Sequence, residues 1–433
     1  MRKLTVKNFS VINEAELEFG KITVLIGPQA SGKSLLCKLA YFLGNEAPNI
    51  VLDTISFSRK WEDVEAQVLS AFSAWFPSGS WGNEQLLIRF ESHFYKVEVS
   101  RIGIGTASQP LNVTFSNELQ ELFVTLVERN KLPPGDRSED LREIRANAWY
   151  ELMALQANDS PSFPAYIPAG RAFFTGIEAG YATLENPAIE QVVRRFGGLI
   201  VWNSSRWKIG LLSSERRMAE NLDNLMERIA GGKVVIRGNT PDFESLDHRT
   251  LPLNMLSSGT QELLPLFNVL SRFAYSYEHE SVLIESFGGS QVAYRPVRKR
   301  PLLYLEEPEA HIFPSTQYEL VQLFSWMAND PMLSFEWVIT THSPYILSSF
   351  NNLLEAWQVA RAKPELKDEV ATLIPEQYWI KEGDFKAYAI EDGVLTSIVA
   401  KDTGLVSANY LDQVSERIGV EFDELLRLGY VES

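Results

Sequence analysis

The segment that most constrains the fold is Gly27–Ser34, which reads GPQASGKS. It fits the pattern G-x-x-x-x-G-K-[ST] of the phosphate-binding P-loop. A short β-branched run, KITVLI at 21–26, precedes the segment, and the helix-compatible run LLCKLAYFL at 35–43 follows it. A strand, a glycine loop and a helix in this order form the arrangement that a phosphate site needs. We therefore predict that a nucleotide binds here.

Each position of this loop has a predicted part in holding the phosphates. Gly27 and Gly32 let the backbone curl, so that successive N–H groups point at phosphate oxygens. Lys33 is expected to reach the β- and γ-phosphates, and the Ser34 hydroxyl is expected to ligate Mg²⁺. The predicted ligands are ATP and Mg²⁺, and the predicted nucleotide-binding residues here are Gly27, Pro28, Gln29, Ala30, Ser31, Gly32, Lys33, Ser34 and Leu35.

The composition describes a well-packed globular protein. The chain has 433 residues, 45 % of them hydrophobic and 11 % aromatic, which is enough for two or three domains. Its formal net charge of −16 gives no general attraction to nucleic acid or to an anionic membrane. The single cysteine, Cys37, excludes an internal disulfide and disfavours a zinc site. Because the sequence shows neither a signal peptide nor about 18 consecutive apolar residues, we expect a cytoplasmic protein without a membrane partner.

The order of the predicted elements divides the chain into a nucleotide-binding core with an insertion. Residues 1–115 are predicted to form the N-terminal lobe of the core, a mixed α/β unit that holds the P-loop. Residues 116–232 are predicted to be mainly a helical insertion. Strand patterns return in 233–375, the predicted C-terminal lobe of the core, and 376–433 are predicted to be a small C-terminal extension. The predicted fold class is α/β.

A second motif follows a strongly apolar strand. The stretch LLYLEEPEAHIFP at 302–314 has the form of a Walker B strand, with carboxylates at the edge where open α/β sheets bind ligands. Glu306 is predicted to hold Mg²⁺ through its water shell, together with Ser34, and Glu307 to accept a proton from the attacking water. Adjacent residues on a strand point to opposite faces, so the two carboxylates cannot share one role.

Two further stretches carry polar residues in positions that suit nucleotide chemistry. LSSGTQE at 256–262 places serines and a glycine at the start of a helix, where N–H groups and the Ser258 hydroxyl can contact a γ-phosphate held by another subunit. The same residues also suit an ordinary helix cap. TTHSPYIL at 340–347 puts His342 at the end of a buried strand. The predicted nucleotide contacts are Ser257, Ser258 and Gly259, and the predicted catalytic residues are Glu307 and His342.

Two features leave their interpretation more open. Pro308–Pro314, directly after the Walker B strand, is expected to cross to a partner subunit. In IPAGR at 167–171, Arg171 could reach a phosphate or transmit the nucleotide state to the helical insertion. A purely structural arginine suits the same sequence equally well.

Together, the P-loop, IPAGR, LSSGTQE, LLYLEEPEAH and TTHSPYIL resemble the ABC-type ATPases related to SMC and RecF proteins. They are more closely similar to the OLD (overcoming lysogenization defect) branch, and to the anti-phage defence ATPases PtuA of Septu and AriA of PARIS. The resemblance implies an ABC-ATPase head that binds ATP between two protomers. Lys33 of one protomer would face Ser258 and Gly259 of the other.

The sequence departs from this pattern in two ways. Glu306 stands where many P-loop enzymes carry aspartate. OLD-family nucleases add a Toprim domain with a D-x-D pair, and the residues after His342 contain no such pair. We therefore expect no intrinsic nuclease activity.

Our leading hypothesis is an ATP-hydrolysing homo-oligomer that acts as a nucleotide-gated sensor and scaffold. It would control a separate effector, a nuclease or a toxin, in bacterial anti-phage defence. One alternative is a RecF-like DNA-repair ATPase that uses the basic clusters Arg194–Arg195, Arg216–Arg217 or Arg298–Arg300 to bind DNA. Another alternative is a structural scaffold with little turnover. The sequence identifies neither the effector nor the trigger.

Overall fold

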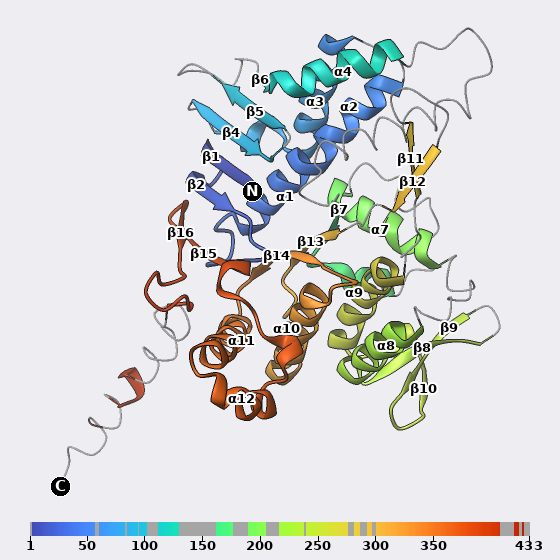
Figure 1. Ribbon diagram of the computed structural model, residues 1–433, viewed down its shortest axis with the longest axis vertical. Helices are drawn as coiled ribbons and strands as arrows, with labels where there is room; N and C mark the ends of the chain where they lie inside the picture. Colours follow the sequence, from blue (N-terminus) through green and yellow to red (C-terminus); the bar gives the residue numbers. More distant parts are fainter. Residues whose placement is uncertain are drawn as a thin grey trace.

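A large mixed sheet with helices on both faces organises the computed structural model of this chain (Figure 1). The predicted α/β fold class is confirmed. The residues that the structure describes are 2–56, 60–82, 85–93, 95–101, 111–129, 162–175, 189–204, 216–237, 240–275, 281–285, 292–296, 300–407, 420–423 and 427.

Parallel strands form one half of this sheet. In spatial order they are β15 (Phe385–Glu391), β3 (Ile22–Ile26), β14 (Glu336–Thr341), β13 (Arg300–Glu306) and β7 (Ser162–Ile167). Each neighbouring pair is parallel. Because parallel strands end at the same edge of a sheet, the segments that follow β3, β13, β14 and β7 meet there. These segments contain the P-loop, Glu307, His342 and Arg171.

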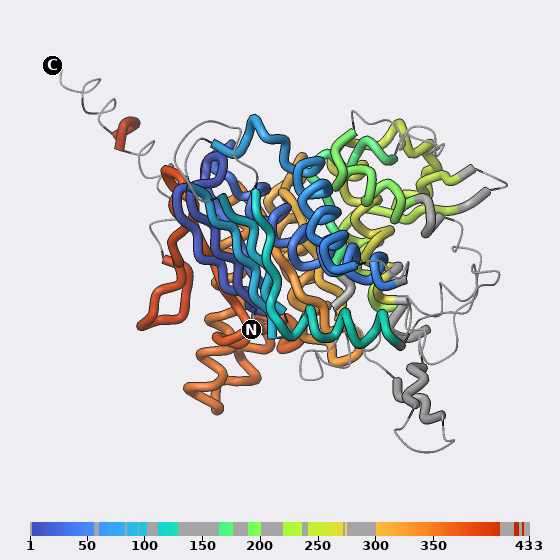
Figure 2. Tube along the Cα trace, turned by 90° about the horizontal axis from the view of Figure 1, so that it is seen from above, coloured from blue at the N-terminus to red at the C-terminus, as the bar shows by residue number. Residues whose placement is uncertain are grey.

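Antiparallel strands form the other half, and they lie side by side in Figure 2. Consecutive pairs are antiparallel in the series β2 (Ile12–Glu18), β1 (Lys3–Phe9), β4 (Leu86–Glu91), β5 (Lys96–Arg101) and β6 (Asn112–Phe115). β4 and β5 form a hairpin within the predicted N-terminal lobe. The short strand β16 (Val394–Ser397) joins the two halves, because it pairs with both β15 and β2.

The helices fall into two groups along the chain. The first group, with a π-helical turn at Phe42–Glu46, is α1 (Lys33–Tyr41), α2 (Ala47–Ser56), α3 (Trp61–Trp75) and α4 (Asn117–Arg129). The second group is α7 (Gln191–Ser204), α8 (Arg216–Ala230), α9 (Ser258–Tyr275), α10 (Pro314–Asn329), α11 (Pro344–Ala362) and α12 (Lys367–Leu373). Two small sheets complete the described structure: β8 (Gly232–Arg237) with β9 (Thr240–Ser245) and β10 (Thr250–Pro252), and β11 (Ser281–Glu285) with β12 (Val292–Pro296).

Two apolar clusters cover the opposite faces of the parallel strands. On β13, Leu302 and Tyr304 belong to the cluster built with α1 to α4, whereas Leu303 and Leu305 belong to the cluster built with α8 to α11. Successive side chains of a strand point to opposite faces, so a strand covered on both faces is apolar at every position. This explains the uninterrupted apolar run that identified the Walker B strand.

Some predicted domain ranges contribute strands to the main sheet. β15 and β16 come from the predicted C-terminal extension at 376–433, and β7 comes from the predicted helical insertion at 116–232. α7 was not predicted as a helix, because its central Gly197–Gly198 pair lowers the helical signal. Residues 130–161, 176–188 and 205–215 of the predicted helical insertion and residues 408–419 of the predicted C-terminal extension lie outside the described residues.

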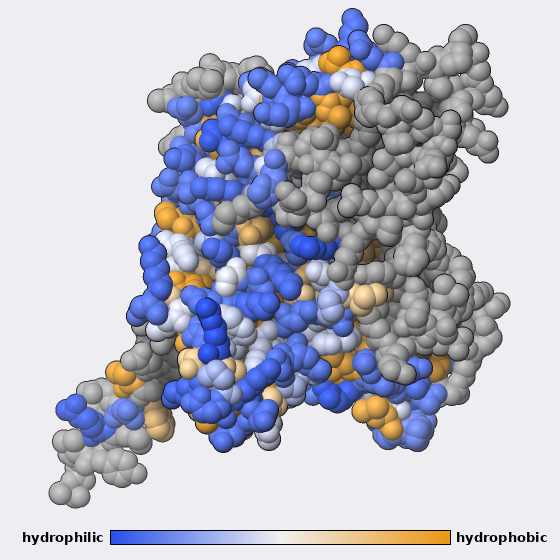
Figure 3. Space-filling view, in the orientation of Figure 1, coloured by the Kyte–Doolittle hydropathy of each residue, from blue (hydrophilic) through white to orange (hydrophobic). Residues whose placement is uncertain are grey.

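No helix in the described part of the chain is long and apolar enough to span a membrane. The face drawn in Figure 3 is largely hydrophilic in its described residues, with apolar residues in small separate groups.

Candidate active site

The P-loop connects β3 to α1, as predicted. α1 begins at Lys33, with Gly32 as its N-cap. Gly32 has a left-handed φ of 104°, and a Cβ at this position would lie 2.4 Å from Cδ1 of Ile12. Only glycine satisfies both the backbone angle and the close approach. The loop is therefore fixed against the turn between β1 and β2.

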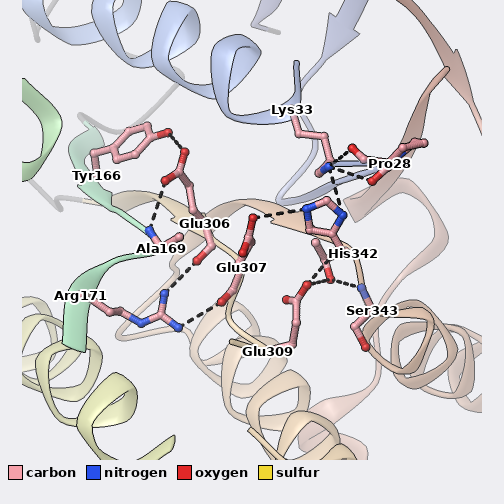
Figure 4. Close-up of polar contacts among 12 residues, drawn as sticks. Pro28, Lys33, Tyr166, Ala169, Arg171, Glu306, Glu307, Glu309, His342 and Ser343 are labelled. Carbon is pink, nitrogen blue, oxygen red and sulfur yellow. Dashed lines mark hydrogen bonds and ion pairs between the residues drawn. The ribbon is translucent and has the colours of Figure 1, made fainter. Parts of the chain in front are cut away.

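The Lys33 ammonium is held inside this loop (Figure 4). Its Nζ donates to the carbonyl oxygens of Gly27 at 2.8 Å and Pro28 at 2.7 Å, and it lies 3.4 Å from Nδ1 of His342. Burial lowers the pKa of Lys33, and the carboxylates of Glu307 and Glu309 oppose this shift. An ammonium group can only donate, so Nδ1 of His342 is the acceptor in this contact.

Glu307 and His342 face each other across the sheet edge (Figure 4). Nε2 of His342 lies 3.3 Å from Oε1 of Glu307, which places the Nε2 proton toward the carboxylate. The Glu307 backbone has a φ of 42°, a left-handed conformation that is uncommon for glutamate and often occurs at functional sites. Its N–H donates to the Thr340 carbonyl at 2.9 Å. The structure thus brings together Lys33, Glu307 and His342.

Glu306 points away from this group, as strand alternation requires (Figure 4). Its Oε1 accepts a hydrogen bond from the Tyr166 hydroxyl at 2.6 Å, and its Oε2 accepts one from the Ala169 N–H at 3.2 Å. Glu306 is 6 % exposed, so its carboxylate is oriented by two specific donors in a buried setting. A carboxylate has about four lone-pair positions, which leaves capacity for the water shell of a cation.

Buried polar atoms near the loop fit a phosphate and a hydrated cation. Within the described residues, Oγ of Ser31, Oγ1 of Thr340 and Oε2 of Glu309 are buried without a hydrogen-bond partner. Such atoms are costly unless a ligand or water pairs with them. Hydroxyl and carboxylate oxygens suit Mg²⁺, which keeps most of its waters and uses few protein ligands besides phosphate.

Glu309 and Gln317 have roles that the sequence did not indicate. Oε1 of Glu309 accepts hydrogen bonds from the Thr341 hydroxyl at 2.8 Å and from the His342 N–H at 2.6 Å. Gln317 accepts a bond from the Ser343 hydroxyl at 2.6 Å. Both contacts hold the segment that presents His342. The sequence signal that could have indicated Glu309 is its place as the third acid of the EEPE stretch at 306–309.

The predicted signature residues lie at the start of α9. Ser257 and Ser258 are exposed, and the Ser257 hydroxyl accepts a bond from the Thr260 N–H at 3.3 Å, so the capping role is present. A Cβ at Gly259 would lie 2.7 Å from the carbonyl oxygen of His311, so this turn packs against the loop after β13. Among the described residues, no hydrogen bond joins Ser258 to Lys33. The predicted contacts of Ser257, Ser258 and Gly259 with a partner's nucleotide stay a prediction.

Arg171 lies on the far side of Glu306 and Glu307 from Lys33 (Figure 4). It is completely buried, and its guanidinium donates to the carbonyl oxygens of Glu306 at 2.8 Å and Glu307 at 3.1 Å. This geometry favours a link between protein segments over direct phosphate contact.

The basic clusters proposed for DNA binding are only partly described. Arg195 pairs with Glu46 at 2.6 Å, which reduces its availability to a phosphate backbone. The side chains of Arg216 and Arg217 and the residues 298–299 lie outside the description.

The family described as "AAA domain, putative AbiEii toxin, Type IV TA system" matches residues 22–348 of this chain. The chain belongs to this family. The matched range of the AAA domain includes the P-loop, the α9 turn, Glu306, Glu307 and His342. Membership confirms the predicted class of P-loop ATPase, whereas the resemblance to the OLD branch and to the Septu and PARIS proteins stays a prediction.

Several solved structures resemble this AAA-domain protein. An SMC head bound to the C-winged helix domain of ScpA has 12 % identity and a TM-score of 0.43, covering 92 % of this chain and 98 % of that one. The SMC head domain from Thermotoga maritima has 11 % identity and a TM-score of 0.35, covering 92 % and 97 %. A dimeric ATP-binding cassette in a post-hydrolysis state with ADP and Pi has 10 % identity and a TM-score of 0.32, covering 91 % and 98 %. These TM-scores are too low to transfer any property to this chain. No curated protein matches the sequence.

Proposed function

We propose that this AAA-domain protein binds and hydrolyses ATP between two copies of the chain, and that its nucleotide state controls a separate effector. The observation that carries the proposal is the convergence of Lys33, Glu307 and His342 at one sheet edge. The exposed turn at Ser257 and Ser258 supports the part that involves a second copy.

In the proposed hydrolysis of ATP, each residue at this sheet edge has a separate role. ATP supplies the phosphoanhydride bond that breaks, and Mg²⁺, when bound, neutralises phosphate charge. Lys33 would bind the phosphates, and Ser34 and Glu306 would hold the cation. Glu307 accepts the proton of the attacking water. His342 orients the Glu307 carboxylate through the Nε2 contact of 3.3 Å.

The wider role that we propose is control of an effector in bacterial anti-phage defence. Its support is the motif resemblance described above and the family description, which names a toxin of a type IV TA system. ATP that binds the closed dimer more tightly than the open one would shift the population between the two. One of the two states would hold the effector, and the other would release it.

Ser258→Arg tests whether ATP is shared between two copies. The substitution places a long cation on the exposed turn of α9, so we expect the closed dimer to fail while each P-loop still binds nucleotide. Each P-loop should still bind ATP, although without the extra affinity of the closed dimer, and steady-state hydrolysis should fall about 100-fold. Light scattering with a non-hydrolysable ATP analogue would measure the dimer, and phosphate release would measure turnover.

Ser78→Arg is the matched control, because Ser78 is also exposed and lies in a different lobe. It should retain both the ATP-dependent dimer and hydrolysis. A wild-type protein that stays monomeric with the ATP analogue, yet turns over ATP, would contradict the shared site.

Tyr166→Phe tests the assignment of Glu306 to the cation. The substitution removes the 2.6 Å hydrogen bond that orients Oε1 of Glu306. Loss of such an outer partner typically weakens a metal site about 10- to 100-fold, so the Mg²⁺ concentration for half-maximal hydrolysis should rise by about tenfold. A Mg²⁺ titration of phosphate release at saturating ATP measures the effect. Tyr304→Phe, in the same aromatic cluster, should leave the Mg²⁺ requirement unchanged.

A further inference from the structure

A buried ion pair joins the first turn of α9 to the segment that follows β7. Glu262 lies one helical turn after Ser258, and Nε of Arg171 lies 3.3 Å from its Oε2. The same Nε donates to the Glu262 carbonyl oxygen at 3.1 Å. Arg171 is 0 % exposed and Glu262 is 4 % exposed. Because both groups are removed from water, loss of either partner would leave the other as an uncompensated buried charge.

The opposite end of the Arg171 guanidinium holds the backbone of the two Walker B glutamates. Nη1 donates to the carbonyl oxygens of Glu306 at 2.8 Å and Pro168 at 3.3 Å, and Nη2 donates to that of Glu307 at 3.1 Å. Glu307 has the left-handed φ of 42°, and its N–H is bound by Thr340. The direction of the Glu307 side chain therefore depends on contacts at both of its peptide groups, and Arg171 supplies one of them.

We propose that Arg171 is a positioning residue that couples the start of α9 to Glu307. This inference rests on the proposed function. When the turn at Ser258 and Gly259 engages the nucleotide of a partner, α9 displaces Arg171 through Glu262, and Arg171 sets the Glu307 backbone for proton acceptance. Contact with the partner's nucleotide thereby activates the base that serves the chain's own nucleotide, and the two sites of a dimer cooperate.

Only arginine can make these contacts together. Its planar fork donates in several fixed directions, whereas a lysine ammonium is a compact point charge on a flexible stem. Arg171→Lys therefore keeps the positive charge beside Glu262 but cannot hold the Glu262, Glu306 and Glu307 carbonyl groups at once. Glu262→Gln keeps the side-chain shape and an acceptor oxygen but removes the charge pair.

The test compares the full-length wild type with Arg171→Lys, Glu262→Gln and the double variant. Phosphate release against ATP concentration gives kcat, KM and the Hill coefficient, and a fluorescent ATP analogue gives Kd. For Arg171→Lys we expect kcat to fall about 100-fold, the cost of a small misplacement of a catalytic group, while Kd changes by less than about threefold. Both single variants should lose cooperativity in ATP. Because the two residues act in one link, the double variant should be no slower than Arg171→Lys alone.

Arg228→Lys is the control for the arginine substitution. The side chain of Arg228 is exposed, and its Nε lies 3.7 Å from Oε1 of Glu319. It should retain wild-type kcat and cooperativity. The coupling is overturned if Arg171→Lys keeps kcat within about twofold of wild type, or if its kcat and its ATP affinity fall together. It is also overturned if the effects of Arg171→Lys and Glu262→Gln on kcat are additive in the double variant. If Arg171→Lys does not fold, Glu262→Gln decides the question by the same criteria. A wild type that neither binds nor hydrolyses ATP would instead refute the proposed function itself.

Discussion

Lys33→Ala is expected to abolish measurable ATP binding. Lys33 is the first residue of α1 and is only 5 % exposed. Its ammonium group donates to the Gly27 and Pro28 carbonyl oxygens, inside the loop that we expect to bind the phosphates. Each hydrogen bond between a charged group and its partner contributes about 1.5–3 kcal/mol, and contacts to two phosphates are lost together. Affinity should therefore fall at least about 100-fold. Titration calorimetry with a non-hydrolysable ATP analogue and Mg²⁺ measures this loss.

Lys38→Ala serves as the control for this experiment. Lys38 lies on the same helix but points to Glu190, with which it forms an ion pair at 2.5 Å. Its loss should leave ATP affinity within about twofold of wild type, since exposed ion pairs contribute little. Unchanged ATP affinity in Lys33→Ala, with Lys38→Ala behaving as expected, would count decisively against the P-loop assignment.

Glu307→Gln is expected to bind ATP but to hydrolyse it about 1,000-fold more slowly, within the range that general-base catalysis supplies. The glutamine has the same shape and keeps an acceptor for Nε2 of His342, but it cannot take a proton from water. Because ATP remains bound, the closed dimer should persist. Single-turnover phosphate release measures the rate, and size-exclusion chromatography with ATP measures the lifetime of the dimer.

Glu319→Gln is a suitable comparison, because this partly exposed glutamate lies on α10 and interacts with Arg228. Its hydrolysis rate should match the wild type. Hydrolysis at the wild-type rate in Glu307→Gln would show that another group accepts the proton.

The core of the candidate site could be predicted because its signals are local. Glu307 and His342 directly follow apolar strands, and Lys33 lies at the end of the glycine loop that follows another, so each belongs to a short motif. Parallel strands end at a common edge, so three separate motifs become neighbours without any detailed knowledge of the fold. The contact between His342 and Glu307 follows from the adjacent positions of β13 and β14.

The remaining contacts depend on tertiary pairings that no local pattern contains. Arg171 finds its partner Glu262 on a distant helix, and both are charged residues that composition alone would place at the surface. Tyr166 resembles an ordinary core aromatic until its hydroxyl is seen to meet Glu306. FKAYAIE at 385–391 is recognisable as a strand, but nothing in it indicates that β15 lies beside β3.

The position of β3 between β14 and β15 has a consequence for how the protein is made. The strand that carries the P-loop emerges early during translation, whereas both of its hydrogen-bonding neighbours are encoded in the last third of the chain. A ribosome-bound intermediate must therefore carry β3 with unpaired edges, which favours slow folding and exposes it to aggregation. The nucleotide pocket can close only when synthesis has passed residue 391, so an interrupted product would retain the P-loop sequence without a completed site around it.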